Sequence, residues 1–268
     1  MSPVLGHRIA GEGEVVLLLN GGMMTLGAWD EIAAPLEARH RVLRCDFRGQ
    51  LLSPGPVPLT LEGQTEELVR LLDALGIDRV HAVGASFGAE VGVILAALRP
   101  DRVASLTAIT ATERLTPGMR EDLRALRAVC REAIAGGDRG RVFDAIAPTT
   151  FGTAYAAAHA ALLAGRRKLF ASLPGTWFVS LDALLAALEQ LDLQTYLGRI
   201  ACRTLVVAAA EDAVFPVEHS RALAGMIEGA TLAVVGGSGH ALIVEKPREL
   251  VVILTQFLGA VPKEEVRQ

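Results

Sequence analysis

Short apolar runs alternate along most of the chain with segments whose apolar positions recur at helical spacing. The runs are rich in Val and Leu and cover residues 15–19, 42–45, 80–83, 103–109, 204–209 and 231–235. Helices are predicted around them, over residues 26–38, 60–75, 87–98, 217–227 and 241–258, the last with a bend near Pro247. Apolar strands separated by helices are typical of a mainly parallel sheet with crossover helices. The pattern therefore predicts an α/β fold.

One long segment breaks this alternation. Between about residues 113 and 198 the strand signal disappears, and the chain is rich in Ala, Leu and Arg at helical spacing, with breaks at residues 136–137, 148 and 174–175. We call residues 113–198 the inserted segment and predict a helical cap, set into an α/β core made of residues 1–112 and 199–268. An insertion at the carboxyl edge of a parallel sheet covers the crevice where such sheets bind ligands. A helical subdomain without ligand contacts is the alternative.

Aromatic side chains in the inserted segment are candidates for pocket walls. Most aromatic residues in helices belong to the core, so we expect only two or three of this set to line a pocket: Phe143, Phe151, Tyr155, Phe170, Trp177 and Phe178.

Composition and charge restrict the class of partner. The chain has 268 residues, 51% of them apolar, and a net charge of −4, so no basic surface for nucleic acid or anionic lipid is expected. The expected partner is a small-molecule substrate that is neutral or not selected by charge. The chain has no signal-peptide pattern and no apolar run approaching 18 residues, which predicts a cytoplasmic protein without a membrane span. The sequence leaves the oligomeric state open. Cys45, Cys130 and Cys202 lie far apart in the sequence and are expected to be free thiols.

The pentapeptide GASFG, residues 84–88, lies between the apolar run 80–83 and a predicted helix. In the strand-to-helix turn known as the nucleophile elbow, the serine backbone is strained, and the positions two before and two after it must be very small. Gly84 and Gly88 meet that requirement. Ser86 is the candidate nucleophile, and the amides at the start of the following helix would favour the oxyanion that forms.

A serine nucleophile needs a base, and the base needs a carboxylate that orients it. Asp212 follows the run 204–209, and His240 lies in a glycine-rich loop after the run 231–235, which is the chain order of this fold. Glu211, next to Asp212, and the more distant Glu113 are alternatives for the acid. The other histidines are expected to be structural or solvated: His7, His40, His81, His159 and His219.

With these residues the chain resembles α/β-hydrolases of the capped serine esterase and lactonase type, the group of 3-oxoadipate enol-lactonases and cofactor-free haloperoxidases. The resemblance covers nearly the whole chain and rests on the elbow, on Asp212 with Pro216 after it, and on residues 239–240 followed by EKP at 245–247. It implies a catalytic triad of Ser86, Asp212 and His240. It also implies an oxyanion hole formed by the backbone N–H groups of Gly22 and Phe87.

Two loops depart from the family pattern. Residues 20–23 read NGGM where the family has His-Gly, so Asn20 either supports the loop through its side-chain amide or simply forms the turn. Residues 46–53 read DFRGQLLS where the family has D-x-R-G-x-G-x-S, so Leu51 removes a glycine and leaves the path of that loop open. We expect Asp46 and Arg48 to form a structural ion pair.

These features predict a hydrolase that cleaves a small to medium apolar ester or lactone through an acyl-enzyme on Ser86. A serine at the elbow excludes the reactions for which relatives use an aspartate nucleophile. The chain has no P-loop or dinucleotide fingerprint, so neither a cofactor nor a metal is expected. Hydrolysis of a carbon–carbon bond or perhydrolysis by the same triad is one alternative. A ligand-sensing protein with little turnover is another.

Overall fold

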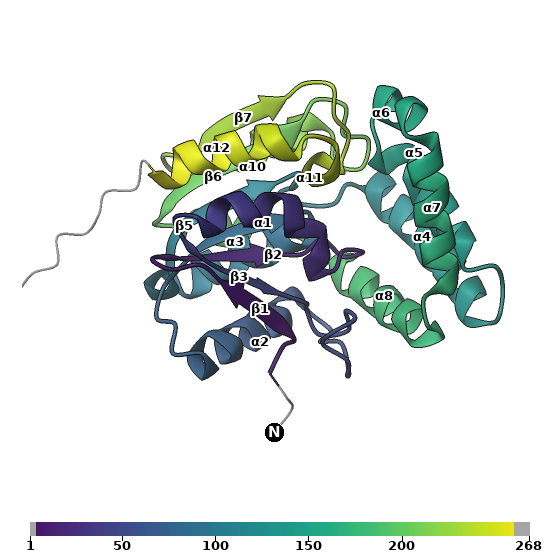
Figure 1. Cartoon of the computed structure of the whole chain (residues 1–268), viewed down its shortest axis with the longest axis horizontal. Helices are drawn as coiled ribbons and strands as arrows, with labels where there is room; N and C mark the ends of the chain where they lie inside the picture. The colour runs from purple at the N-terminus through teal and green to yellow at the C-terminus, as the bar shows by residue number, and fades with distance from the viewer. Residues whose placement is uncertain (1–3, 260–268) are drawn as a thin grey trace, which may run out of the picture.

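The computed structural model describes residues 4–259, and within that range a single seven-stranded sheet forms the centre of the molecule (Figure 1). The strand order is β1-β3-β2-β4-β5-β6-β7, with β1 antiparallel to β3 and all other neighbours parallel. The strands are β1(His7–Ala10), β2(Val15–Leu19), β3(Arg41–Cys45), β4(Val80–Ala85), β5(Val103–Ile109), β6(Arg203–Ala209) and β7(Thr231–Val235). This arrangement confirms the predicted α/β fold class.

All six predicted strands are present, each at or within two residues of its expected bounds. The sequence missed β1, because its four residues alternate between partly buried and exposed at the sheet edge and make no apolar run. Residues 1–3 and 260–268, which the prediction assigned to the core, lie outside the described part of the chain.

Helices cover both faces of the sheet. One face packs against α1(Asp30–Glu37), the short α11(Leu242–Glu245) and α12(Pro247–Gly259), and the other against α2(Leu61–Ala74), α3(Phe87–Leu98) and α10(Val217–Gly225) (Figure 1). Two predicted helices are divided in the structure. The first begins as a 3₁₀ turn over Leu26–Trp29, and the last breaks between α11 and α12 where Pro247 begins the second helix.

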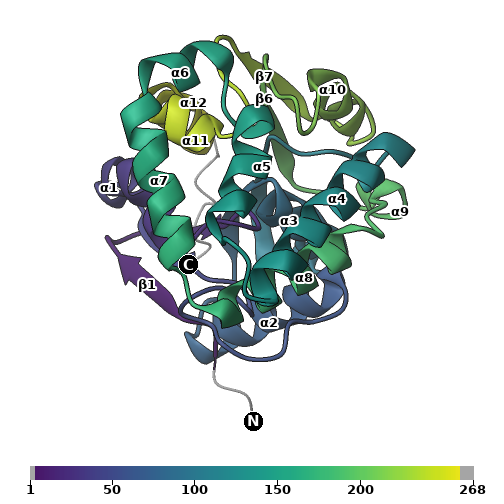
Figure 2. The same cartoon turned by 90° about the vertical axis from the view of Figure 1, so that its right-hand side faces the viewer.

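The inserted segment follows β5 and precedes β6, and it is helical. Its helices are α4(Pro117–Ile134), α5(Gly140–Thr150), α6(Thr153–Ala158), α7(Ala160–Ser172), α8(Gly175–Leu188) and α9(Gln194–Leu197). They lie beside the sheet in Figure 1, and α4 to α8 face the viewer in Figure 2. Arg127 on α4 pairs with Asp182 on α8 at 2.8 Å and with Glu189, the residue that follows α8, at 2.7 Å. These ion pairs reinforce the α4–α8 contact.

The prediction for the aromatic residues of the inserted segment is wrong. None of the six lines the cavity described below. They pack on one another instead, with Phe143 against Phe151 and Phe170, and Trp177 against Phe170 and Phe178, at ring separations of 4.9–6.4 Å. Trp177 and Phe178 belong to a small internal core of the segment, together with aliphatic residues such as Val142 and Leu181.

No single helix within residues 4–259 combines the length and the apolar composition that a membrane span requires. The bent pair of α7 and α8 meets both criteria only when the two are joined.

Candidate active site

The turn between β4 and α3 holds Ser86 in a strained conformation, with φ 50° and ψ −124°. Its N–H donates to the Ile109 carbonyl at 2.9 Å, which ties the turn to the neighbouring strand. A Cβ atom on Gly84 would lie 2.3 Å from the Gly88 oxygen, and one on Gly88 would lie 2.4 Å from the Leu19 oxygen. The backbones therefore pass too closely for any side chain at these positions, as the elbow motif predicts.

His240 and Asp212 form a hydrogen-bonded pair, with 2.8 Å between Nδ1 and Oδ2. The other carboxylate oxygen of Asp212 accepts from the N–H groups of Val214 and Phe215 at 2.9 and 2.8 Å, which fixes the carboxylate in place. Burial opposes protonation of the imidazole, but the charge and hydrogen bond of Asp212, together with the charges of Glu90 and Glu245, outweigh burial and raise the pKa of His240 above its ordinary value. The pair is therefore arranged to stabilise an imidazolium.

The alternative acids lie elsewhere. The side chain of Glu113 is buried and contacts His219, with 3.1 Å between Oε2 and Nδ1. Glu211 is exposed, and its carboxylate lies beside Gly152 at the start of α6. Of the three candidate carboxylates, Asp212 is the one bonded to His240.

Ser86 and His240 line one cavity of about 470 Å³. Its walls are mostly apolar, with side chains from the carboxyl edge of the sheet and from α4, α5 and α8, among them Leu123, Leu126, Val129, Ile146, Leu184 and Leu188. Among the lining residues Asp122 is the only one besides His240 with an ionisable side chain, and it is exposed. The cavity can thus accept an apolar group next to the serine and the histidine.

Gly22 and Phe87, the residues predicted for the oxyanion hole, also line this cavity. Phe87 is the first residue of α3, so its N–H has no acceptor within the helix. Asn20, fully buried, supports the Gly22 loop. Its Nδ2 donates to Asp46 and Gln50 at 2.8 and 3.0 Å, and its Oδ1 accepts from the Trp29 indole at 3.0 Å.

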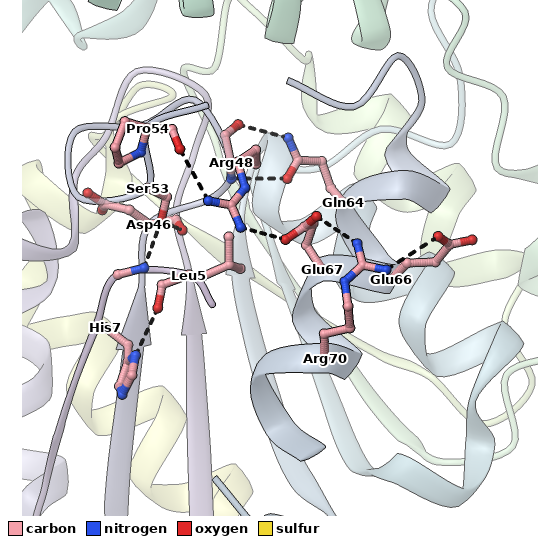
Figure 3. A network of polar contacts seen from close by, with 11 residues as sticks. Leu5, His7, Asp46, Arg48, Ser53, Pro54, Gln64, Glu66, Glu67 and Arg70 are labelled. Atoms are coloured by element: carbon pink, nitrogen blue, oxygen red, sulfur yellow. Dashed lines mark hydrogen bonds and ion pairs between the residues drawn. The ribbon is translucent and has the colours of Figure 1, made fainter. Parts of the chain in front are cut away.

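The expected ion pair between Asp46 and Arg48 is wrong, because the two side chains leave the loop in different directions. Asp46 accepts from Asn20 and from the N–H groups of Leu26 and Leu52 at 2.8 and 2.9 Å. Arg48 instead pairs with Glu67 on α2 at 2.7 Å and donates to the Pro54 carbonyl, as Figure 3 shows. Both residues are structural: one braces the loop before α1, and the other fastens the loop after β3 to α2.

Two further residues lie at the site without having been predicted from the sequence. Gln50 donates to the Gly21 carbonyl at 2.8 Å and accepts from Asn20. These bonds hold the loop in place although position 51 carries no glycine. Leu51 does not need a positive φ, since among described non-glycine residues only Ser86 and Thr110 adopt one. Glu90, one helical turn after Ser86, is fully buried, and burial raises the pKa of its carboxyl to about 7. In the sequence, the only sign of this buried carboxyl was that Glu90 is a charged residue within an otherwise apolar helix.

Comparisons with known proteins identify the family of the chain. A family model for the alpha/beta hydrolase fold matches residues 14–247. "Putative carbamate hydrolase RutD" from Variovorax paradoxus is 33% identical over 254 residues and is matched over 93% of each chain. The enol-lactonase from Burkholderia xenovorans has a TM-score of 0.84 at 26% identity, covering 95% of this chain and 96% of its own. A thermophilic esterase from Thermogutta terrifontis has a TM-score of 0.83 at 26% identity, covering 97% and 94%.

The sheet, the elbow and the matched family model define one class of protein. The chain belongs to the alpha/beta hydrolase fold family. Within that family it is a hydrolase, related over nearly its full length to enzymes named for carbamate, lactone and ester hydrolysis.

Proposed function

We propose that this hydrolase cleaves a small to medium apolar carboxylic ester or lactone through an acyl-enzyme on Ser86. The observation that carries the proposal is the apolar cavity lined by both Ser86 and His240, with His240 bonded to Asp212. The inserted segment acts as a cap in this proposal, since α4, α5 and α8 supply much of the cavity wall.

The chemistry follows the serine-triad scheme. His240 takes the proton of the Ser86 hydroxyl while the oxygen attacks the substrate carbonyl, and the oxyanion accepts from the N–H groups of Gly22 and Phe87. The C–O bond then breaks, and His240 returns the proton to the leaving alcohol. Water attacks the acyl-enzyme in the same way, which releases the acid and restores Ser86.

The charges that line the cavity favour neutral over anionic substrates. Among its described lining residues there is no Lys or Arg, and Asp122 is a carboxylate on α4. An anionic substrate would lose its hydration without gaining a counter-charge. A neutral substrate has no such cost, so we propose that carboxylate-bearing lactones and free carbamate anions are poor substrates.

A neutral carbamate ester is the second candidate. The name of the Variovorax paradoxus relative favours it, and attack by Ser86 on a carbamate carbonyl requires the same groups. The nitrogen lone pair makes that carbonyl less reactive than an ester of equal size, so the two can be ranked by rate on matched compounds.

A panel of matched substrates tests the proposal. We expect kcat/KM on p-nitrophenyl esters to rise by roughly fourfold per methylene, from about 0.8 kcal/mol for each buried CH₂, and to peak at roughly two to eight acyl carbons where the cavity wall is met. A terminal carboxylate on the acyl chain should lower kcat/KM at least tenfold. Efficiency that still rises at sixteen carbons would contradict the enclosed cavity. A matched carbamate that reacts faster than its ester would favour the second candidate, and slow turnover of all compounds would favour a sensor.

A further inference from the structure

The loop that carries His240 is attached to the inserted segment as well as to the core. Glu245, at the end of α11, accepts from the N–H of Gly239 at 3.2 Å with each carboxylate oxygen. The same two oxygens accept from the N–H of Gly152, between α5 and α6, at 3.2 and 3.3 Å. One buried carboxylate therefore joins the residue before the histidine to Gly152, which lies 93 residues before Glu245 in the sequence.

A second contact ties the residue after the histidine to the same place. The N–H of Ala241 donates to the Thr150 carbonyl at 2.9 Å. The backbones also touch: a Cβ atom on Gly239 would lie 2.5 Å from the Gly152 nitrogen and 2.9 Å from the Thr150 oxygen. His240 thus lies between two backbone positions that are both held by residues 150–152.

We propose that Glu245 is a positioning residue, whose carboxylate holds the α5–α6 junction and the His240 loop together so that the inserted segment and the imidazole are placed as one unit. This inference rests on the proposed function of His240 as the base. Asp212 sets the orientation of the ring through Nδ1, and Glu245 sets the place of the backbone from which the ring projects. A shift of about 1 Å in a base can lower a rate by about a hundredfold, so this second restraint affects turnover.

A carboxylate suits this position because both of its oxygens face N–H donors. Burial, the largest influence, and the nearby Glu211 raise the pKa of Glu245 above its ordinary value, and the N–H groups of Gly152 and Gly239 and the charge of Lys246 oppose this rise only in part. An ionised carboxylate has only acceptor sites and can accept from both amides at once. A glutamine of the same size offers one acceptor oxygen and an NH₂ group, and that NH₂ group would face an N–H donor.

The test compares Glu245→Gln with Glu249→Gln, which removes an exposed carboxylate from the adjoining helix. Two readouts do not need turnover: hydrogen exchange of the Gly152 and Gly239 amides, and the NMR signal of the His240 Nδ1 proton. We expect exchange at both amides to become at least tenfold faster in Glu245→Gln, and the proton signal to shift or broaden. Glu249→Gln should match the wild type. Unchanged exchange or an unchanged proton signal in Glu245→Gln overturns the proposal.

The kinetic readout separates positioning from substrate binding. On the best ester of the panel, Glu245→Gln should lower kcat by about 10- to 100-fold while KM changes less than threefold. Faster amide exchange with an unchanged kcat overturns the positioning role. A wild type that hydrolyses no ester would disprove the proposed function. Amide exchange and the Nδ1 proton signal would still decide whether Glu245 holds the loop.

A second variant covers the case in which Glu245→Gln does not fold. In Gly152→Ala the new Cβ would lie 3.0 Å from Oε2 of Glu245 and 3.1 Å from the Gly239 nitrogen, so these atoms must move by a few tenths of an ångström. We expect Gly152→Ala to lower kcat at least fivefold with little change in KM. Full activity in Gly152→Ala together with wild-type exchange at Gly239 contradicts the proposal.

Discussion

At the scale of the residue, the orientation of His240 depends on one carboxylate. Asp212 accepts from its Nδ1 at 2.8 Å, whereas Glu113 contacts His219. An asparagine at position 212 can donate to the ring and favour the wrong tautomer, so Asp212→Asn should lower kcat by about 10⁴-fold. Glu211→Gln and Glu113→Gln are the controls and should change kcat less than threefold, measured under the same conditions. If either glutamine variant lost more activity than Asp212→Asn, the acid would be the other carboxylate.

Single residues could be predicted where a motif fixes their surroundings. Gly84 and Gly88 identify the elbow because the close backbone approach excludes every other residue there. Partners within an irregular loop could not be predicted in this way. Asp46 and Arg48 have opposite charges two positions apart, but the loop directs Asp46 toward Asn20 and Arg48 toward Glu67. Sequence proximity carries no information about side-chain direction in such a loop.

At the scale of the element, buried parallel strands were predictable because each is a continuous apolar run between two helices. The edge strand β1 was not, since half of its residues face solvent. The helical nature of the inserted segment was visible in its spacing, but the direction of its faces was not. Phe143 and Trp177 point into the segment itself, while Leu123 and Leu184 line the cavity. Tertiary packing decides which face of a helix contacts which partner, and the periodicity of the sequence does not reveal it.

The elbow gives a prediction about stability at this scale. In Gly88→Ala, the new Cβ would lie 2.4 Å from the Leu19 oxygen, so β2 or α3 must shift. We expect the free energy of unfolding to fall by about 1–3 kcal/mol, lowering Tm by roughly 2–10 °C. Gly92→Ala on the same helix meets only the side-chain ends of Leu106 and Leu19, at 3.3 and 3.4 Å. Equal thermal unfolding curves for the two variants would contradict this account of the elbow.

At the scale of the whole molecule, the buried carboxyl of Glu90 links stability to pH. Burial raises its pKa to about 7 in the folded state, above the ordinary value of 4.5. Between these values the unfolded chain has lost the proton that the folded chain keeps, so this group makes stability fall as pH rises from about 4.5 through 7. At about 1.4 kcal/mol per pH unit, Glu90→Gln should remove a decrease of roughly 1–3 kcal/mol between pH 4.5 and pH 8.

Urea unfolding at the two pH values measures this difference. The comparison cancels the pH-independent cost of a buried amide, and the protonation of His40 and His81, whose pKa values burial lowers, is shared by both proteins. The same pH dependence in wild type and Glu90→Gln would show that Glu90 keeps its ordinary pKa.

The fold as a whole could be predicted from the sequence because its α/β alternation and its three chemical motifs appear in a single order along the chain. The cavity could not, because it is formed where residues from β2–α1, α3, the inserted segment and the last loop meet. Its lack of basic lining residues and its contact with the His240 loop through Glu245 are properties of that assembly.

Labelling with a short-chain fluorophosphonate tests the central claim most directly. The reagent reacts with a serine whose proton a neighbouring base removes, so it reports on Ser86 and His240 without any assumption about the substrate. Intact mass and peptide mapping should show one adduct per chain, located on Ser86, that is absent in Ser86→Ala and forms much more slowly in His240→Ala. A wild-type protein that remains unlabelled, or an adduct that persists in Ser86→Ala, would contradict the assignment of Ser86 as the nucleophile.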